Sequence, residues 1–271
     1  MSDFALLTIF RKKQITNHKS QIANIMDTEL QLLVEKVKSY SWYPPEIRPL
    51  YGDSNDTLFF PAGPGMYSKE EGRLSEKAVM IIGDRYSPNL NVLKVHGVRQ
   101  DHSRSTHAWN ELLDLLIQAG IDPLDCFFTN YLLGIRSRIP NSASRIPHPI
   151  SRMSLPSSYF RDHCRDIFRL TLELQRPRLI LVLGLKAASF LSRLHPQILV
   201  WQNIKTYNNV DDEYSSIIRD VPLVSTQVTT LVLLLHPVRR KTHISSRKNG
   251  NSSGNSAETR LLRTVVASCK L

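Results

Sequence analysis

The sequence predicts an α/β protein, a three-layer α/β/α sandwich around a central, mostly parallel four-stranded sheet. Four short strand-like runs are separated by segments with the 3.6-residue apolar periodicity of helices. Strands that alternate with helices are typical of parallel sheets covered on both faces. Three of the four runs are apolar at every position, which indicates strands that are buried on both sides.

The first predicted strand, residues 78–82, ends at Gly83 and passes into Asp84. Upstream of it, residues 27–37 show a helical apolar face, and residues 39–72 form a proline-rich loop. Downstream, residues 103–120 form the clearest helix, because an apolar stripe is followed by Gly120, a common helix stop. The second predicted strand follows at residues 126–131.

The second half of the chain continues the alternation. A helix is expected over residues 157–175, then a strand at 179–183, then Gly184 and a helix over 186–194. Residues 195–229 are poorly patterned, with one plausible strand near 221–225. The last strong strand, 231–235, is followed at once by His236.

Three regions are predicted along the 271 residues. Residues 1–74 form an N-terminal helix and a proline-rich extension, residues 75–244 form the α/β domain, and residues 245–271 form a basic C-terminal tail. Within this tail, the Ser/Asn/Gly-rich stretch 245–256 reads as a linker, and a final short helix can follow over 257–267.

Composition indicates a folded protein with an anionic partner. The hydrophobic share of 41% excludes wholesale disorder, while a formal charge of +11 and a pI near 9.7 favour a polyanion. Nucleic acid is the first candidate, and an anionic membrane surface is the second.

The cellular setting follows from what the sequence lacks. We expect no membrane span and no secretory signal at the N-terminus. The three cysteines have no paired spacing, which suits a reducing cytoplasm and argues against a disulfide or thiolate–metal framework. The sequence therefore predicts a cytoplasmic protein. We also expect it to be a monomer.

Polar or flexible residues follow each of the four strong strands. These residues are Asp84, Asn130, the Gly184 turn and His236. Because ligands bind outside the carboxyl ends of the strands in open α/β sheets, we expect these four positions to share one site. Three of them also have an ordinary structural explanation: a helix cap or salt bridge for Asp84, a strand-end turn for Asn130, and a chain turn for His236.

Four motifs in this order resemble the uracil-DNA glycosylase superfamily. They are Gly-Asp after the first strand, Phe-Thr-Asn-Tyr at the second, Arg-Pro-Arg-Leu-Ile-Leu-Val-Leu-Gly-Leu-Lys-Ala-Ala at the third and Leu-Leu-His-Pro-Val at the fourth. The resemblance covers about residues 75–240 and is nearest to the thermophile-type iron–sulfur branch. Residues 177–188 are its most specific part.

The resemblance implies roles for individual residues. Asp84 and His236 would be catalytic: the carboxylate stabilises the sugar cation and orients water, and the imidazole donates to the carbonyl oxygen of the departing base. A base inside a duplex must be flipped into a pocket to be reached. The pocket would hold that base with Asn130 and with the residues around the first loop, namely Gly83, Tyr86 and Ser87.

The chain departs from the family pattern at three places. Arg85 occupies the third position of the first motif, where a small or acidic residue is usual. Ser87 stands where classical uracil enzymes carry an aromatic residue that excludes a C5 methyl group. Either the pocket accepts C5-substituted pyrimidines, or Tyr86 takes the place of that aromatic residue. The iron–sulfur branch binds its cluster with four cysteines. In this chain only Cys164 lies near one of those four positions, so we expect no cofactor.

A basic surface is predicted beside the site. Six arginines face one acid between residues 134 and 165, and the chain from Arg239 onward is also basic. Phosphate contacts are expected from Arg136, Arg138, Lys186, Arg239, Arg240 and Lys241. A merely solvated loop is the alternative for the arginine-rich segment.

Two functions remain open from the sequence. The first is a DNA glycosylase that excises uracil or a modified pyrimidine from single- or double-stranded DNA, in repair or in defence against phage with modified bases. The second is a catalytically impaired relative that binds nucleic acid as a sensor or regulator; the Arg85 substitution keeps it open. A nucleotide-processing enzyme is disfavoured, because the chain has no phosphate-binding glycine loop.

Overall fold

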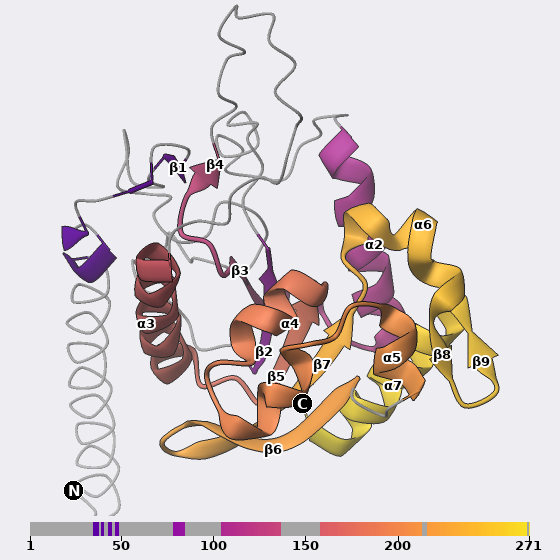
Figure 1. Ribbon diagram of the computed structural model, residues 1–271. Coiled ribbons are helices and arrows are strands. Elements are labelled where there is room, and N and C mark those ends of the chain that lie inside the picture. The colour runs from indigo at the N-terminus through magenta and orange to yellow at the C-terminus, as the bar shows by residue number, and fades with distance from the viewer. Residues whose placement is uncertain are drawn as a thin grey trace, which may run out of the picture.

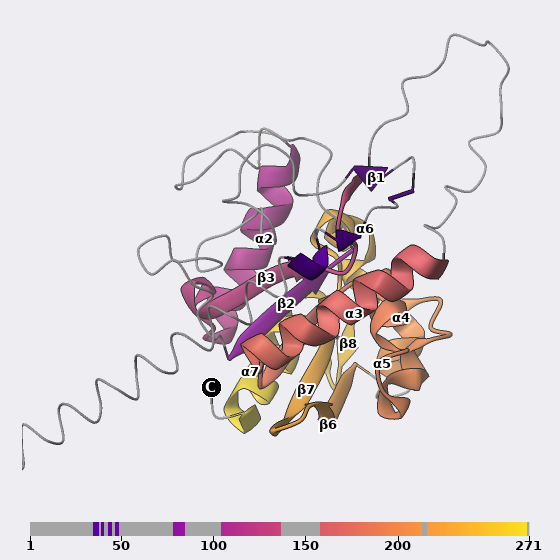
Figure 2. The same ribbon diagram turned by 90° about the vertical axis from the view of Figure 1, so that its left-hand side faces the viewer.

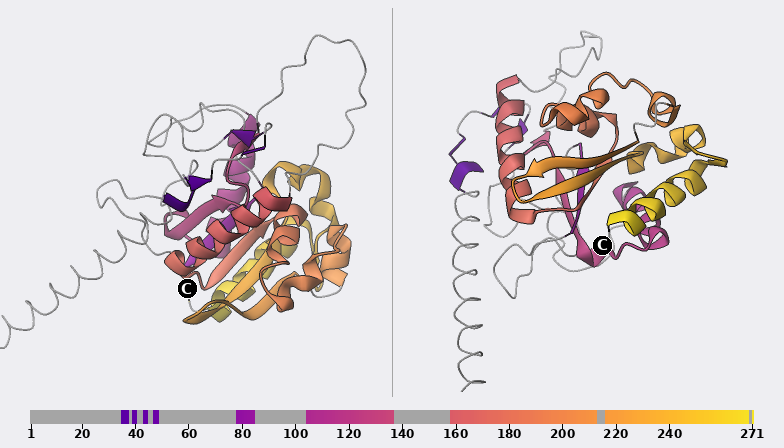
Figure 3. Two further views of the ribbon diagram at one scale, coloured as in Figure 1. Left: turned by 60° about the vertical axis from the view of Figure 1, so that its left-hand side comes forward. Right: turned by 90° about the horizontal axis from the view of Figure 1, so that it is seen from below.

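The computed structural model describes residues 35–37, 39–40, 43–44, 47–48, 78–84, 104–136, 158–212, 216–269 and 271. In this part of the chain a central sheet lies between two layers of helices (Figures 1 and 3). This is the three-layer α/β/α sandwich that the strand–helix alternation predicts.

The sheet has five strands in the order β3-β2-β5-β7-β6. Four of them are parallel and match the predicted strands: β2 (Val79–Gly83), β3 (Cys126–Asn130), β5 (Leu179–Leu183) and β7 (Gln227–Leu234). The fifth strand, β6 (Ile217–Val224), pairs antiparallel with β7 at the edge of the sheet. All five residues of β2 and of β5 are buried, as their apolar runs predict.

Alternate strand residues face two separate apolar cores. One core joins the sheet to α3 (Ser158–Gln175), α4 (Leu185–Leu191) and α5 (Tyr207–Asp212). The other joins it to α2 (Arg104–Ala119) and α7 (Gly254–Cys269). Within β2, for example, Met80 and Ile82 belong to the first core, whereas Val79 and Ile81 belong to the second. This alternation explains why the strand is apolar at every position.

The C-terminal segment belongs to the core, so the predicted boundary between residues 244 and 245 does not separate a tail. After β7 the chain forms η5 (Pro237–Arg239), α6 (Arg240–His243) and η6 (Ile244–Ser246), then the strand pair β8 (Lys248–Asn249) and β9 (Ser252–Ser253). α7 then buries Leu261, Leu262 and Val265 against the sheet. The predicted linker is therefore structured, and Arg247 within it is only 1% exposed.

The described pieces of the N-terminal region pack on the α/β domain. β1 (Ile47–Arg48) pairs antiparallel with β4 (Ile135–Arg136), and Tyr40 and Tyr43 pack on Phe160 of α3. Of the helix predicted over residues 27–37, residues 35–37 are described and are helical. No helix in the described ranges combines the length and the apolar character needed to cross a bilayer.

Candidate active site at the carboxyl edge of the sheet

The ends of the parallel strands bring the predicted site residues to one edge. Following the strand order, Asn130 ends β3, Asp84 follows β2, Gly184 follows β5 and His236 follows β7 by two residues. Gly83 and Asn130 are paired in register. The expectation that these four positions lie at the same edge is therefore met by the sheet topology.

Two glycines allow the strand exits to approach each other. A Cβ on Gly83 would overlap the Oδ1 atom of Asn130, and a Cβ on Gly184 would lie 3.1 Å from the Cβ of His236. Gly184 also has φ 91° and ψ 159°, a conformation that is essentially restricted to glycine. Glycine at both positions is thus needed for the amide and the imidazole to sit where they do.

Asp84 is held by two donors from neighbouring elements. Its carboxylate Oδ2 lies 3.5 Å from Lys186 Nζ, and its side chain is 15% exposed. The hydroxyl of Tyr131, the residue after β3, hydrogen-bonds the same carboxylate, while the Tyr131 ring stacks on Phe190 at 4.6 Å. Burial first, and the Asp84 charge second, raise the pKa of Tyr131. Tyr131 is therefore a neutral hydrogen-bond donor that orients Asp84.

His236 caps the short helix that follows β7. Its Nδ1 atom accepts a hydrogen bond from the Val238 backbone N–H at 3.3 Å. In a neutral imidazole, a nitrogen that accepts leaves the proton on the other nitrogen, here Nε2. The local turn thereby selects the tautomer in which Nε2 can donate.

Tyr207 of α5 ties two strand exits together. Its hydroxyl hydrogen-bonds the backbone of both His236 and Leu185, and burial, the largest cause, raises its pKa. The Arg247 guanidinium carbon lies 5.7 Å from the centre of the Tyr207 ring. Tyr207 therefore links the exits of β5 and β7 to a charged group in the interior.

That group belongs to a buried network of two arginines and two acids behind the exit of β7. Glu258 is 0% exposed, ion-pairs with Arg240, and accepts a hydrogen bond from the Leu235 N–H at 2.7 Å. Arg247 lies between the two acids, with Nε 3.7 Å from Glu258 and Nη2 3.3 Å from Asp211. Its Nη2 also donates to the Leu233 carbonyl at 3.2 Å. The four charges sum to zero, and they anchor the backbone that leads into His236.

The structure contradicts the predicted phosphate contact of Arg240. The residue is 6% exposed, and its guanidinium binds Glu258 and, at 2.8 Å, Asn255 Oδ1. A cation already paired in the interior does not face a DNA backbone, so the prediction for this residue is wrong. Its neighbours Arg239 and Lys241 are exposed, as expected.

The remaining predicted site residues fall into three groups. Lys186 is 63% exposed and reaches Asp84, so it borders the site instead of lying apart from it. For Arg136 the structure describes only the backbone, in β4. Three predicted site residues lie outside the described ranges: Tyr86, Ser87 and Arg138.

The cysteines lie away from any metal-like arrangement. Cys126 and Cys164 are 0% exposed, and burial, the largest cause, raises the pKa of the Cys164 thiol to about 12. Within the described ranges, no three His, Cys, Asp or Glu side chains gather in a way that could hold a metal ion.

Sequence reasoning missed Tyr131, Tyr207 and the buried network. Tyr131 had a signal, because it directly follows Asn130 in the Phe-Thr-Asn-Tyr motif and a polar hydroxyl there can reach the neighbouring strand exit. Arg247 and Glu258 had none, since charged residues in a polar segment are ordinarily exposed.

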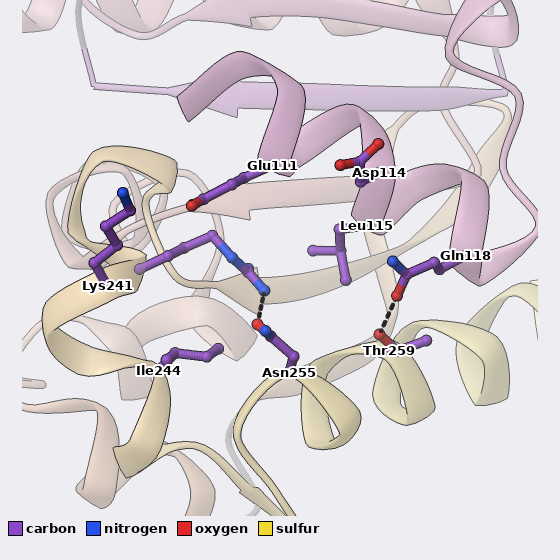
Figure 4. A pocket seen from close by; sticks show the side chains of 9 residues that line it. Glu111, Asp114, Leu115, Gln118, Lys241, Ile244, Asn255 and Thr259 are labelled. Carbon is purple, nitrogen blue, oxygen red and sulfur yellow. Dashed lines mark hydrogen bonds between the residues drawn. The ribbon is translucent and has the colours of Figure 1, made fainter. Parts of the chain in front are cut away.

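A separate pocket of about 240 Å³, which is lined mostly by polar and charged residues, lies between α2, the 240–244 segment and α7 (Figure 4). Thr259 of α7 donates to Gln118 of α2 across it at 3.5 Å, and Arg240 donates to Asn255. The pocket includes none of the predicted catalytic or base-binding residues, so it is distinct from the site at the sheet edge.

Comparison of the chain with protein-family models and with curated proteins finds no match.

Proposed function

We propose that the protein is a DNA glycosylase that flips out and excises uracil or a C5-substituted pyrimidine and leaves an abasic site. The observation that carries the proposal is the meeting of Asp84, Asn130 and His236 at one edge of the parallel sheet. A carboxylate, an amide and an imidazole are the groups that this reaction needs.

Each group matches one demand of breaking a nucleoside C–N bond. Positive charge develops on the sugar, and the Asp84 carboxylate stabilises it and orients the attacking water. Negative charge develops on the departing base, and the Nε2–H of His236 donates to its carbonyl oxygen. The Asn130 amide offers both a donor and an acceptor to the edge of the base.

The charge of the chain supports DNA as the substrate. The formal charge of +11 attracts phosphates, and the exposed residues Lys186, Arg239 and Lys241 lie at or near the strand exits. In this proposal the enzyme works as a cytoplasmic monomer without a cofactor. It acts in base-excision repair or in defence against phage whose DNA carries modified bases.

A second candidate is a catalytically impaired relative that binds nucleic acid as a sensor or regulator. The observation that favours it is the engagement of Asp84 by both Lys186 and Tyr131. A carboxylate with two partners is less able to bind water than one that faces an open pocket.

The test compares strand cleavage after alkali treatment for matched single- and double-stranded DNAs. The DNAs carry uracil, thymine, or 5-hydroxymethylcytosine with and without its sugar. We expect wild-type excision of at least one base, reduced about 10²–10⁴-fold by Asp84→Asn and by His236→Ala, with binding retained. Asn130→Asp should change which base is excised.

One result discriminates between the two candidates, and another tests the role of Asp84. Gel-shift binding by the wild type without alkali-labile sites on any of these DNAs would favour the binding relative. Full activity of Asp84→Asn would show that another group positions the water.

A further inference from the structure

A row of arginines runs along one flank of α3. Arg161, Arg165 and Arg169 are spaced by four residues, so they lie on the same side of the helix, and Arg193 follows α4 beside them. We call these four residues the arginine row. α3 crosses the front of the molecule in Figure 2, with α4 alongside it.

The row carries more positive charge than its neighbours neutralise. Asp162 pairs with Arg165, and Asp166 lies 3.4 Å from Arg169. No carboxylate in the described part of the chain pairs with Arg161 or Arg193. Glu173 follows Arg169 by four residues, so four cations face three acids along this flank.

The crowding of these cations is physically costly. The side chain of Arg165 is 13% exposed. Burial, the largest cause, lowers the pKa of Arg165. The Asp162 carboxylate opposes this effect, while the charges of Arg193, Arg161 and Arg169 lower the pKa further. The Nε atoms of Arg161 and Arg165 are buried without a hydrogen-bond partner among the residues described. Buried donors are normally satisfied, so these two are exceptions within the described part of the chain.

The row starts at the candidate active site. Arg161 is close enough to Tyr131 for its charge to oppose the rise of the Tyr131 pKa, and Tyr131 hydrogen-bonds Asp84. From there, arginines four residues apart advance by about 6 Å each along the helix. This step is on the scale of one nucleotide, so successive arginines can meet successive phosphates of one strand.

We propose that the arginine row binds the sugar–phosphate backbone of a single nucleic-acid strand that leads away from the site at the sheet edge. The choice of nucleic acid rests on the proposed function. The guanidinium fork suits phosphate oxygens, and a line one residue wide fits one strand better than a membrane surface, which is broad.

The test measures anisotropy of a fluorescent oligothymidylate of about 20 nucleotides between about 50 and 200 mM salt. Arg169→Gln/Arg193→Gln changes the two exposed members of the row and leaves the two partly buried ones in place. Each lost phosphate contact should reduce the magnitude of the logarithmic salt slope by about 0.7. Two contacts then correspond to a slope change of about 1.4 and an affinity loss of about 25-fold at 0.1 M salt.

Two control variants separate the row from overall charge. Arg260→Gln/Arg263→Gln removes the same net charge from α7, which covers the other face of the sheet, and should leave the slope unchanged. Arg169→Lys/Arg193→Lys keeps both charges and should keep most of the slope. The proposal would be contradicted if the two glutamine variants had equal effects or if the wild type did not bind the oligonucleotide. It would also be contradicted if binding to phosphatidylserine vesicles depended on the row and binding to DNA did not.

Single-turnover excision at saturating DNA distinguishes failure of the row from failure of the glycosylase. The glutamine variant in the row should keep the wild-type rate constant there, because its residues act on binding. If the protein excises a base but its DNA binding does not depend on the row, the proposal for the row fails and the proposed glycosylase activity stands. A wild type that excises no base but shows the row-dependent slope would keep the row and discard the glycosylase.

Discussion

Replacing Glu258 by glutamine removes one negative charge from the interior and keeps the size of the side chain. Glu258 is 0% exposed, ion-pairs with Arg240, lies 3.7 Å from Arg247 Nε, and accepts the Leu235 N–H. With Asp211 the four buried charges sum to zero. The variant therefore leaves one buried positive charge without a counter-charge.

The expected loss of unfolding free energy is about 3 kcal/mol. Breaking a buried ion pair by removing one partner costs about 3–5 kcal/mol, because the other charge stays buried. We expect the lower end, since the glutamine oxygen can still accept from the Leu235 N–H and from one guanidinium. A typical domain has only about 5–15 kcal/mol of stability, so the variant should be severely weakened.

Urea denaturation followed by tryptophan fluorescence measures this loss, because Trp201 is fully buried. With a urea slope of about 1–3 kcal/mol per molar, the midpoint should fall by at least about 1 M. Glu35→Gln, the same change at an exposed position, is the matched control and should stay within about 0.5 kcal/mol of the wild type.

A double variant tests the cause. Adding Arg240→Met to Glu258→Gln removes the excess charge, so the pair should cost less than the sum of the two single changes. If Glu258→Gln alone remained within about 0.5 kcal/mol of the wild type, the buried network would contribute nothing to stability, and the basic C-terminal tail predicted over residues 245–271 would be the better description.

Three further predictions concern the strand exits and the cysteines. Gly184→Ala should lower the melting temperature more than Gly120→Ala. Both glycines have positive φ, but a Cβ contacts His236 only at Gly184. The conformation of Gly184, which is essentially restricted to glycine, adds about 1–3 kcal/mol to the cost of the substitution. At pH 8 a thiol reagent should modify the half-buried Cys269 of the native protein and spare Cys164, whose pKa is about 12; equal labelling in mass spectra would contradict this. Purified protein should show no visible absorbance and no bound iron, whereas stoichiometric iron would mean that other ligands replace the cysteines.

The sequence by itself determined the parallel part of the sheet and the edge where the candidate site residues gather. Strands buried on both faces must be apolar at every position, so β2 and β5 were readable as continuous runs. Parallel strands also end at the same edge, so residues after each run could be grouped without coordinates. Asp84, Asn130 and His236 were placed together in this way.

For the edge strand β6, the sequence predicted only a plausible strand near residues 221–225. It is antiparallel, half exposed and broken by register shifts, with Asp220 at a positive φ of 54°. These irregularities remove the period-2 pattern by which a half-buried strand is recognised.

Tertiary structure alone decided which charges are exposed and which residues touch Asp84. Arg240, Arg247 and Glu258 look like solvated residues in a polar segment, yet they neutralise one another in the interior. Lys186 and Tyr131 come to Asp84 from other strand exits, across gaps in sequence that no local pattern spans. The energy of a buried charge depends on partners distant in sequence, and these partners are brought together only when the chain has folded.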